Sequence, residues 1–174
     1  VSTTGFVAHP ALSPDGTRLA WVQWSTARMP WEQALLHVAP VDGDEIESTP
    51  TRAALQPEWV DDDELLYLDD PTGRWNLQRL RLGHPATALA PAEADTGGGL
   101  WVLGNRWYQR LDDGRVVAVR TDGADEIVLI SRDGEAVELL TLPISAGASI
   151  DDAQGSRVLI SGAGRTVGAG LWCV

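Results

Sequence analysis

Four arginines recur along the chain at nearly constant spacing. They are separated by 46, 46 and 45 residues and are Arg28, Arg74, Arg120 and Arg165. Trp31 and Trp75 lie close to the first two of them. Arginine can grip a carboxylate through two parallel hydrogen bonds, and Arg and Trp are enriched at the centres of binding surfaces. These six residues are therefore a candidate site for a partner surface or a peptide carboxylate. Chance is the alternative, since Arg is the chain's only strongly basic residue type.

Serine hydrolase chemistry would need a Ser in a strained Gly-x-Ser-x-Gly turn and a His as its base. The nearest match, around Ser149, lacks the second glycine and precedes a predicted strand. His9 lies beside a proline, His37 lies within a predicted strand, and His84 lies in a Gly-His-Pro turn. We therefore predict no catalytic residue, and we predict that this chain alone is not an enzyme.

Two acidic runs, 61–64 and 151–152, could supply oxygen ligands for Ca²⁺. Both fall at the turn position of a repeated hairpin, where carboxylates cap backbone N–H groups, so we predict no metal site. The glycine-rich run 162–170 resembles a phosphate-binding loop. It does not lie between a strand and a helix, which is the setting such loops need. No cofactor is predicted.

The candidate residues are carried by a hairpin motif that recurs four times. In each copy a turn, usually rich in Asp or Gly, separates two short apolar runs, and the copies span 12–21, 59–68, 111–119 and 150–160. Their turns are aligned on Gly16, Asp63, Gly114 and Gly155, which gives steps of 47, 51 and 41 residues. A hairpin repeat of about this length is typical of β-propeller blades.

Each repeat continues with a third apolar run, at 34–39, 76–82 and 126–130, and 136–140 is predicted to be an outer fourth strand. Only 51–55 has a weak helical period. Four tryptophans at strand positions are predicted to be core residues: Trp21, Trp59, Trp101 and Trp172.

The predicted fold is all-β: a partial β-propeller of about four blades, each a four-stranded antiparallel sheet, with the last blade truncated in its third strand. We predict one propeller segment, 1–174, with repeats at roughly 6–50, 51–94, 95–143 and 144–174. Loops between the second and third strands of such blades share one face. The four arginines, each placed in such a loop, are therefore expected to share that face.

The composition limits the classes of partner. The chain has 25 acidic and 13 basic residues and a formal net charge of -12, which disfavours nucleic acid and anionic membranes. Its single cysteine, Cys173, excludes an internal disulfide, and the N-terminal residues do not resemble a signal peptide. These features favour a cytoplasmic location. The chain begins without Met, so a fragment or a processed form is expected.

Several segments carry a resemblance to a known family. Residues 13–21, Ser-Pro-Asp-Gly-Thr-Arg-Leu-Ala-Trp, resemble the blade signature of propellers in prolyl oligopeptidase-type serine peptidases and of TolB-like propellers. Segments 28–31, 56–59 and 70–77 are similar to segments of the dipeptidyl aminopeptidase/acylaminoacyl peptidase-like members. The spacing of Glu93, Ala94, Asp95, Gly98, Trp101, Gly104 and Tyr108 resembles their next blade. The chain departs from the pattern at 60–63, usually Ser-Pro-Asp-Gly, and at Thr96, usually Phe.

The resemblance implies the non-catalytic propeller portion of such a peptidase, which caps the active site and gates access of small peptides. The family's α/β-hydrolase domain is not in this chain. The expected partner is therefore that domain of a parent protein, or a second propeller segment, and open strand edges would also permit a homo-oligomer. The alternative is a stand-alone TolB-like propeller scaffold for protein–protein interaction. Neither the substrate nor the true blade number follows from the sequence.

Overall fold

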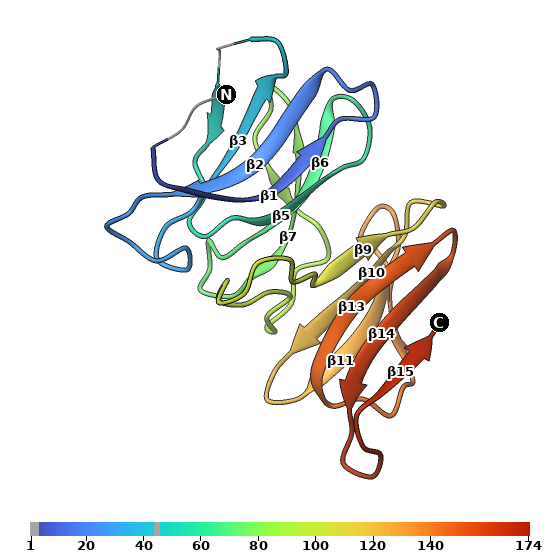
Figure 1. The fold of residues 1–174 in the computed structure, drawn as a ribbon. Helices are drawn as coiled ribbons and strands as arrows, with labels where there is room; N and C mark the ends of the chain where they lie inside the picture. Colours follow the sequence, from blue (N-terminus) through green and yellow to red (C-terminus); the bar gives the residue numbers. More distant parts are fainter. Residues whose placement is uncertain (1–3, 44–45) are drawn as a thin grey trace. The chain divides into compact units, whose positions relative to one another are not determined.

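The computed structural model describes residues 4–43 and 46–174, and every helix or strand element assigned in them is a β-strand (Figure 1). The strands form four antiparallel sheets. The all-β propeller fold predicted from the repeat is confirmed. The weak helical period at 51–55 produces no helix, because Leu55 begins a strand. None of the described residues forms a helix long and apolar enough to cross a bilayer.

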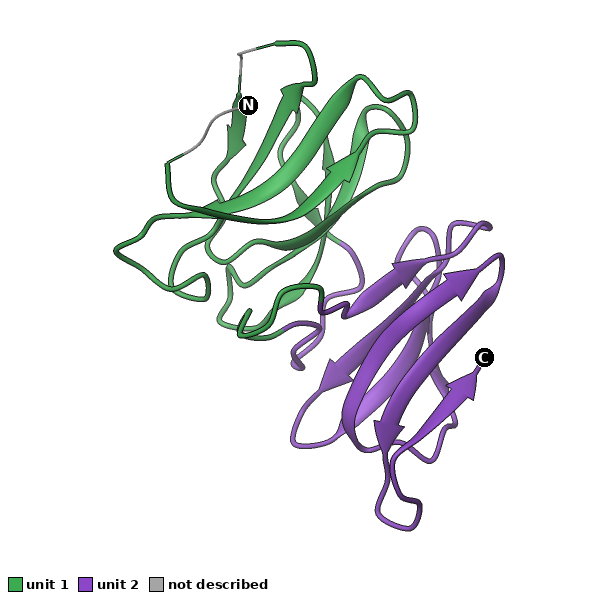
Figure 2. Ribbon diagram, in the orientation of Figure 1, with its two compact units in different colours: residues 1–88, 98–104 green, residues 89–97, 105–174 purple. Residues whose placement is uncertain are grey.

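The chain divides into two compact units, one of residues 1–88 and 98–104 and the other of residues 89–97 and 105–174 (Figure 2). The first unit holds two four-stranded sheets whose strands are ordered as in the sequence. The strands of the first sheet are β1 (Phe6–Leu12), β2 (Arg18–Trp24), β3 (Leu35–Pro40) and β4 (Glu47–Thr49). Those of the second are β5 (Leu55–Trp59), β6 (Glu64–Asp69), β7 (Asn76–Arg81) and β8 (Thr87–Ala88).

The second unit holds a four-stranded and a three-stranded sheet. The strands of the former are β9 (Tyr108–Arg110), β10 (Val116–Thr121), β11 (Asp125–Ile130) and β12 (Val137–Leu140). Those of the latter are β13 (Ala146–Gln154), β14 (Arg157–Ala163) and β15 (Gly170–Cys173). Residues of both sheets form one buried apolar cluster, including Val117, Ile127, Ile150 and Ile160. The three-stranded last sheet matches the predicted truncation.

The four repeated hairpins are β1–β2, β5–β6, β9–β10 and β13–β14, as the sequence motif predicted. The fourth turn lies at Gly155, the position on which its repeat was aligned, but it does not include the two aspartates. Asp151 and Asp152 belong to strand β13, and the chain reverses at Gly155, whose φ is 64°. The interpretation of these two aspartates as turn residues is therefore wrong. A register shift between Ile150 and Asp152 lets the strand continue past them.

Three of the four first strands carry a β-bulge that the sequence analysis did not predict. The register shifts in β1 and β5 and the first of the two in β13 each include a residue with positive φ: His9 at 50°, Gln56 at 43° and Gly147 at 62°. His9 and Gln56 precede prolines and are 47 residues apart, the same step as the first two hairpins. The backbone N–H of Gln56 donates to Nδ1 of His9 at 3.2 Å, which links the two bulges. A bulge adds twist to a strand, so the repeated bulge is a regular feature of these blades.

Two of the four predicted core tryptophans, Trp21 and Trp59, are buried, as predicted. Trp172 is partly buried and packs against the apolar cluster of the second unit. For Trp101 the prediction is wrong, because this side chain is 77% exposed. It lies two residues after Gly99, the last of three consecutive glycines, in a segment that forms no strand, so no sheet covers it.

Candidate functional site

The structure places five of the six candidate site residues in loops between second and third strands. Arg28 and Trp31 lie between β2 and β3, Arg74 and Trp75 between β6 and β7, and Arg165 between β14 and β15. Arg120 does not lie in a loop. It belongs to strand β10, so that part of the prediction is wrong. Arg28, Trp31, Arg74 and Trp75 belong to the first unit, and Arg120 and Arg165 to the second. A shared binding face stays a prediction.

Arg120 acts as a tether inside the second unit. Arg120 is the register partner of Glu126 across β10 and β11, and the Arg120 guanidinium donates to the carbonyl oxygen of Ala90. Burial lowers the pKa of Arg120, and the nearby Glu126 carboxylate opposes that effect. Close by, Thr121 exchanges two backbone hydrogen bonds of 2.9 Å with Asp95. Arg120 therefore holds the segment around Ala90 onto the sheet and is not displayed for a partner.

Trp31 is half-buried and belongs to an apolar patch whose other members are exposed. Its ring lies 4.1 Å from the ring of Trp101, measured between centroids. The side chains of Met29, Val102 and Leu103 are also exposed in these two segments. We call these five residues the Trp31–Trp101 patch: Met29, Trp31, Trp101, Val102 and Leu103. A single exposed apolar residue is ordinary, but a cluster of them often marks an interaction site. Three adjacent apolar residues, 101–103, could have indicated this patch in the sequence. The hairpin repeat favoured a different interpretation, in which Trp101 is a core residue of a strand.

The loop that carries Arg74 and Trp75 is anchored to the rest of the first unit. The Nε1–H of Trp75 donates to the carbonyl oxygen of Ala53 at 2.9 Å, and Gly73 supplies the positive φ of the turn. Arg74 is half-buried and interacts with other described residues. Trp75 therefore positions the loop, and neither side chain extends freely into solvent.

Arg165 lines a cavity of about 310 Å³ in the second unit. Asp125 and Glu126 line the same cavity, together with apolar residues such as Leu140, Leu142 and Ile144. The Asp125 carboxylate already accepts hydrogen bonds from Thr121 Oγ1 and the backbone N–H of Ala148. A ligand carboxylate that met Arg165 here would also meet two negative side chains. The cavity is therefore a poor carboxylate site.

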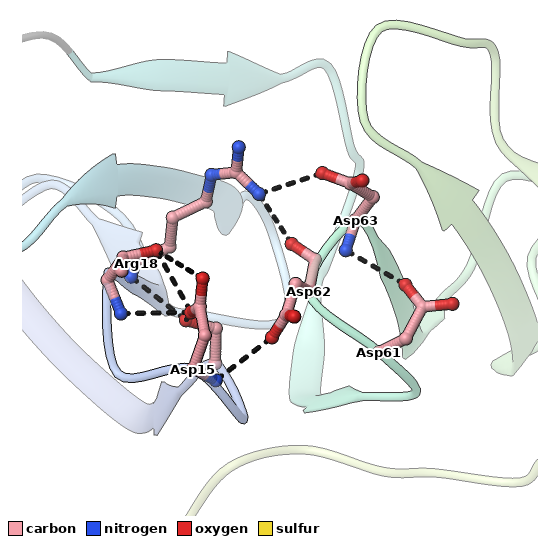
Figure 3. Close-up of polar contacts among 7 residues, drawn as sticks. Asp15, Arg18, Asp61, Asp62 and Asp63 are labelled. Carbon is pink, nitrogen blue, oxygen red and sulfur yellow. Dashed lines mark hydrogen bonds and ion pairs between the residues drawn. The ribbon is translucent and has the colours of Figure 1, made fainter.

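The acidic turns of the first unit form a hydrogen-bonded network with Arg18 (Figure 3). Asp62 Oδ1 accepts from the backbone N–H of Asp15 at 2.9 Å, and the Arg18 guanidinium binds Asp63 at 2.8 Å and the Asp62 carbonyl. Asp61 caps the backbone N–H of Asp63 at 2.8 Å. For Asp61 and Asp62, the predicted capping of backbone donors by the run 61–64 is confirmed. Asp63 binds Arg18 instead, and Glu64 begins strand β6. Nowhere in 4–43 and 46–174 do three or more His, Cys, Asp or Glu residues gather as metal ligands.

The Asp15 carboxylate accepts several hydrogen bonds within the first hairpin turn. Hydrogen bonds from Ser13 Oγ at 2.6 Å and from the backbone N–H and hydroxyl of Thr17 stabilise its charged form. These bonds lower the pKa of Asp15 to about 2, with the Ser13 bond as the largest cause. The carboxylate therefore stays charged and closes the first hairpin turn.

The histidines occupy structural positions. His37 stacks on Trp21 with ring centroids 5.4 Å apart, and its Nδ1 lies 2.7 Å from Ser48 Oγ. Burial lowers the pKa of His37, so the ring is neutral near neutral pH. His37 and Ser48 are direct partners across β3 and β4, a register that the sequence did not predict. Ser149 lies in β13. Neither serine lies in a Gly-x-Ser-x-Gly turn.

Comparison with solved structures decides the family. A puromycin-hydrolyzing peptidase of Mycobacterium tuberculosis is 32% identical, with a TM-score of 0.92, over 100% of this chain and 28% of that chain. Prolyl oligopeptidase B of Galerina marginata, at 17% identity, has a TM-score of 0.70 over 97% of this chain and 24% of that chain. The chain belongs to the propeller region of prolyl oligopeptidase-type peptidases. A putative TolB of Agrobacterium tumefaciens shares the fold, with 15% identity and a TM-score of 0.65 over 85% of this chain and 52% of that chain.

No protein-family model matches the chain, and the comparison with curated proteins finds no match. The family therefore rests on the structural comparison together with the sequence segments that resemble it. This propeller region spans a little more than a quarter of the length of the Mycobacterium tuberculosis peptidase. It does not include a catalytic domain.

Proposed function

We propose that this propeller region caps the active site of a peptidase and gates the entry of small peptides. The observation that carries the proposal is the 32% identity and TM-score of 0.92 over the full length of this chain with a puromycin-hydrolyzing peptidase. The role of the propeller would be to limit substrate size, while a hydrolase domain of the parent protein supplies the chemistry. By itself the chain would have no peptidase activity.

The proposed partner is the α/β-hydrolase domain of that parent protein or a second propeller segment, and the proposed location is the cytoplasm. The Trp31–Trp101 patch supports a protein contact, because the exposed ring of Trp101 lies against the half-buried ring of Trp31. Tryptophan is among the residues that contribute most to protein interfaces. Arg28 lies in the same loop as Met29 and Trp31 and would add charge at the edge of the contact.

The experiment uses the parent protein and a series of peptides of increasing length. If the propeller gates entry, kcat/KM falls steeply with peptide length in the intact protein. The double variant Trp31→Ala/Trp101→Ala weakens the proposed contact and should flatten this dependence, while the shortest substrate is cleaved almost as fast. Val167→Ala, an exposed apolar side chain outside the patch, is the matched control. A length dependence identical in all three proteins would contradict gating through this patch.

The alternative function is a stand-alone propeller scaffold for protein–protein interaction, favoured by the shared fold with the putative TolB. The two proposals differ in one observable. A reading frame that contains this chain and encodes a Gly-x-Ser-x-Gly hydrolase domain supports the peptidase. A reading frame that encodes propeller blades alone supports the scaffold.

A further inference from the structure

The first unit contains a cavity of about 580 Å³ that the proposed function does not use. It is bounded by residues 47–50 at β4, by β6 and β7, and by the loop 83–86 that follows β7. We call it the β6–β7 cavity. On each strand, two residues separated by one position line it: Tyr67 and Asp69 on β6, and Gln78 and Leu80 on β7. Since side chains alternate between the faces of a strand, this pattern means that one face of the sheet forms the floor.

The floor of the cavity carries polar side chains, whereas the buried face of a propeller blade is normally apolar. Tyr67 and Gln78 are direct partners across β6 and β7, and Asp69 is the next residue on the same face of β6. All three are more than nine-tenths buried, with exposed fractions of 2% for Tyr67, 8% for Gln78 and 5% for Asp69. Buried polar groups normally find hydrogen-bond partners, so three of them around one cavity need an explanation.

Tyr67 and Gln78 have the most hydrogen-bonding capacity left. Among residues 4–43 and 46–174, the Tyr67 hydroxyl forms no hydrogen bond, and the Gln78 side chain forms only a long one, from its amide nitrogen to the Asn76 carbonyl at 3.5 Å. The Gln78 amide oxygen therefore remains available as an acceptor. Asp69 is better satisfied: its Oδ1 accepts from the backbone N–H of Arg52 and Ala53 at 3.0 and 2.8 Å. Its Oδ2 has a contact of 3.3 Å to the Arg52 N–H, and the backbone N–H of Asp70 also hydrogen-bonds to this carboxylate. Because each carboxylate oxygen has two lone pairs, the group can still accept from a ligand.

The charges around the cavity select the ligand class. Among the described residues that line it, Glu47 and Asp69 are acidic, Tyr67 and His84 are the other titratable ones, and none is an Arg. An ion pair of 3.4 Å joins Arg52 to Asp70, and neither residue lines the cavity. The rest of the wall includes the apolar residues Pro50, Pro71, Leu80, Pro85 and Ala86. A ligand that fits is therefore a cation that donates several hydrogen bonds and carries an apolar body.

We propose that the β6–β7 cavity binds a small organic ammonium ion, a primary amine with an apolar body. Its ammonium group donates to the Asp69 carboxylate, the Tyr67 hydroxyl and the Gln78 amide oxygen, and its body packs against the prolines and Leu80. Burial raises the pKa of Asp69, against hydrogen bonds from backbone N–H groups and the charge of Arg52. A bound cation would favour the charged carboxylate. The cavity and the Trp31–Trp101 patch share no residue. Binding of an amine in the cavity does not depend on the proposed gating.

The test is a titration of the full chain with benzylamine and with n-butylamine, followed by backbone amide NMR. We expect saturable shifts at residues 48–49, 67, 78 and 84, with a dissociation constant in the low millimolar range or tighter. Benzyl alcohol, which has the same body without the charge, should not saturate. Tyr67→Phe removes one acceptor without a change in packing and should raise the dissociation constant about tenfold, since hydrogen bonds to charged groups are the stronger ones. Glu135→Gln, an exposed carboxylate of the second unit, is the control variant and should change nothing.

Gln78→Leu provides a second variant that preserves volume, and it should also weaken both amines by several-fold. Asp69→Asn keeps the hydrogen bonds to residues 52 and 53 through its amide oxygen but removes the charge, and it should abolish detectable binding. The amide spectrum of each variant shows whether it is folded. The absence of saturable shifts with both amines would overturn the proposal. Equal binding of benzyl alcohol, or unchanged affinity in both Tyr67→Phe and Gln78→Leu, would overturn it as well.

Discussion

At the scale of single residues, several charged side chains of this chain form hydrogen bonds with backbone groups. Asp15, Asp61 and Asp62 accept from backbone N–H groups in turns, and Asp69 caps the backbone of residues 52–53. Arg120 binds a backbone carbonyl. These residues are typical of hairpin-rich proteins, in which tight turns leave backbone groups that side chains must satisfy.

The low pKa of Asp15 leads to a pH-dependent stability. Its folded-state pKa is about 2, below the usual 3.8, so the group stabilises the fold above pH 3.8 and loses that effect as pH falls toward 2. We expect Asp15→Asn to lower the urea midpoint at pH 7 and to reduce the decline in midpoint between pH 5 and pH 2.5. Asp42→Asn, in an exposed turn of the same unit, is the control. A decline equally steep in Asp15→Asn and in the parent chain would contradict this role.

The position of Arg120 in β10 predicts an effect on stability and not on binding. Arg120→Ala leaves the Ala90 carbonyl without its donor and removes buried methylenes, so we expect a loss of about 1–3 kcal/mol in the free energy of unfolding. Arg165→Ala, at an exposed loop position, should change it by less than about 0.5 kcal/mol. Urea unfolding of the two variants measures the contrast. Equal stabilities would mean that Arg120 is not a tether.

At the scale of elements, the hairpins could be predicted from the sequence and the details between them could not. The turns carry Asp and Gly at fixed places because only a few residues tolerate their backbone conformations, so β1–β2, β5–β6 and β9–β10 were visible. The bulges at His9 and Gln56 were not predicted, because a residue before proline normally avoids the left-handed region. Arg120 was misplaced because a polar residue near the end of a strand looks like loop. Trp101 was misplaced because its glycine-rich neighbours leave it outside any sheet.

The candidate site was less predictable than the fold for a physical reason. Loop spacing showed that Arg28, Arg74 and Arg165 lie between second and third strands, but it could not show which groups they meet. The β6–β7 cavity depends on the pairing of Tyr67 with Gln78, a register that follows from sheet formation. The contact of Trp31 with Trp101 joins residues 70 positions apart and has no local sequence signal.

The turn glycines provide a prediction about the hairpin element itself. Gly123 joins β10 to β11 with φ of 73°, and nothing lies within 4 Å of the position a Cβ would take. Gly123→Ala should therefore cost about 1 kcal/mol of stability through backbone strain alone. Gly168→Ala is the matched control, because that position also has open space but no positive φ. Thermal unfolding compares them, and equal melting temperatures would mean that the strain at position 123 is relieved.

At the scale of the whole molecule, the last sheet presents an unpaired strand. Its order is β13–β14–β15, so within the described residues β15 pairs on one side only, and the side chain of Leu171 is 68% exposed. A strand edge of this kind offers backbone groups to another strand, and an exposed apolar side chain strengthens the contact. In the proposed parent protein, a fourth strand from another part of the protein would cover this edge. In the isolated chain a second copy is the available partner.

We therefore expect the isolated chain to self-associate, and Leu171→Arg to shift it toward monomer, because a charge on an edge strand opposes strand pairing. The control is Leu103→Arg, which places the same charge at an exposed position of the Trp31–Trp101 patch. Gel filtration with light scattering over a wide range of concentrations gives the mass of each species. If Leu103→Arg dissociates the chain and Leu171→Arg does not, self-association runs through the patch. A parent chain that stays monomeric at every concentration would mean that the edge of β15 is already protected.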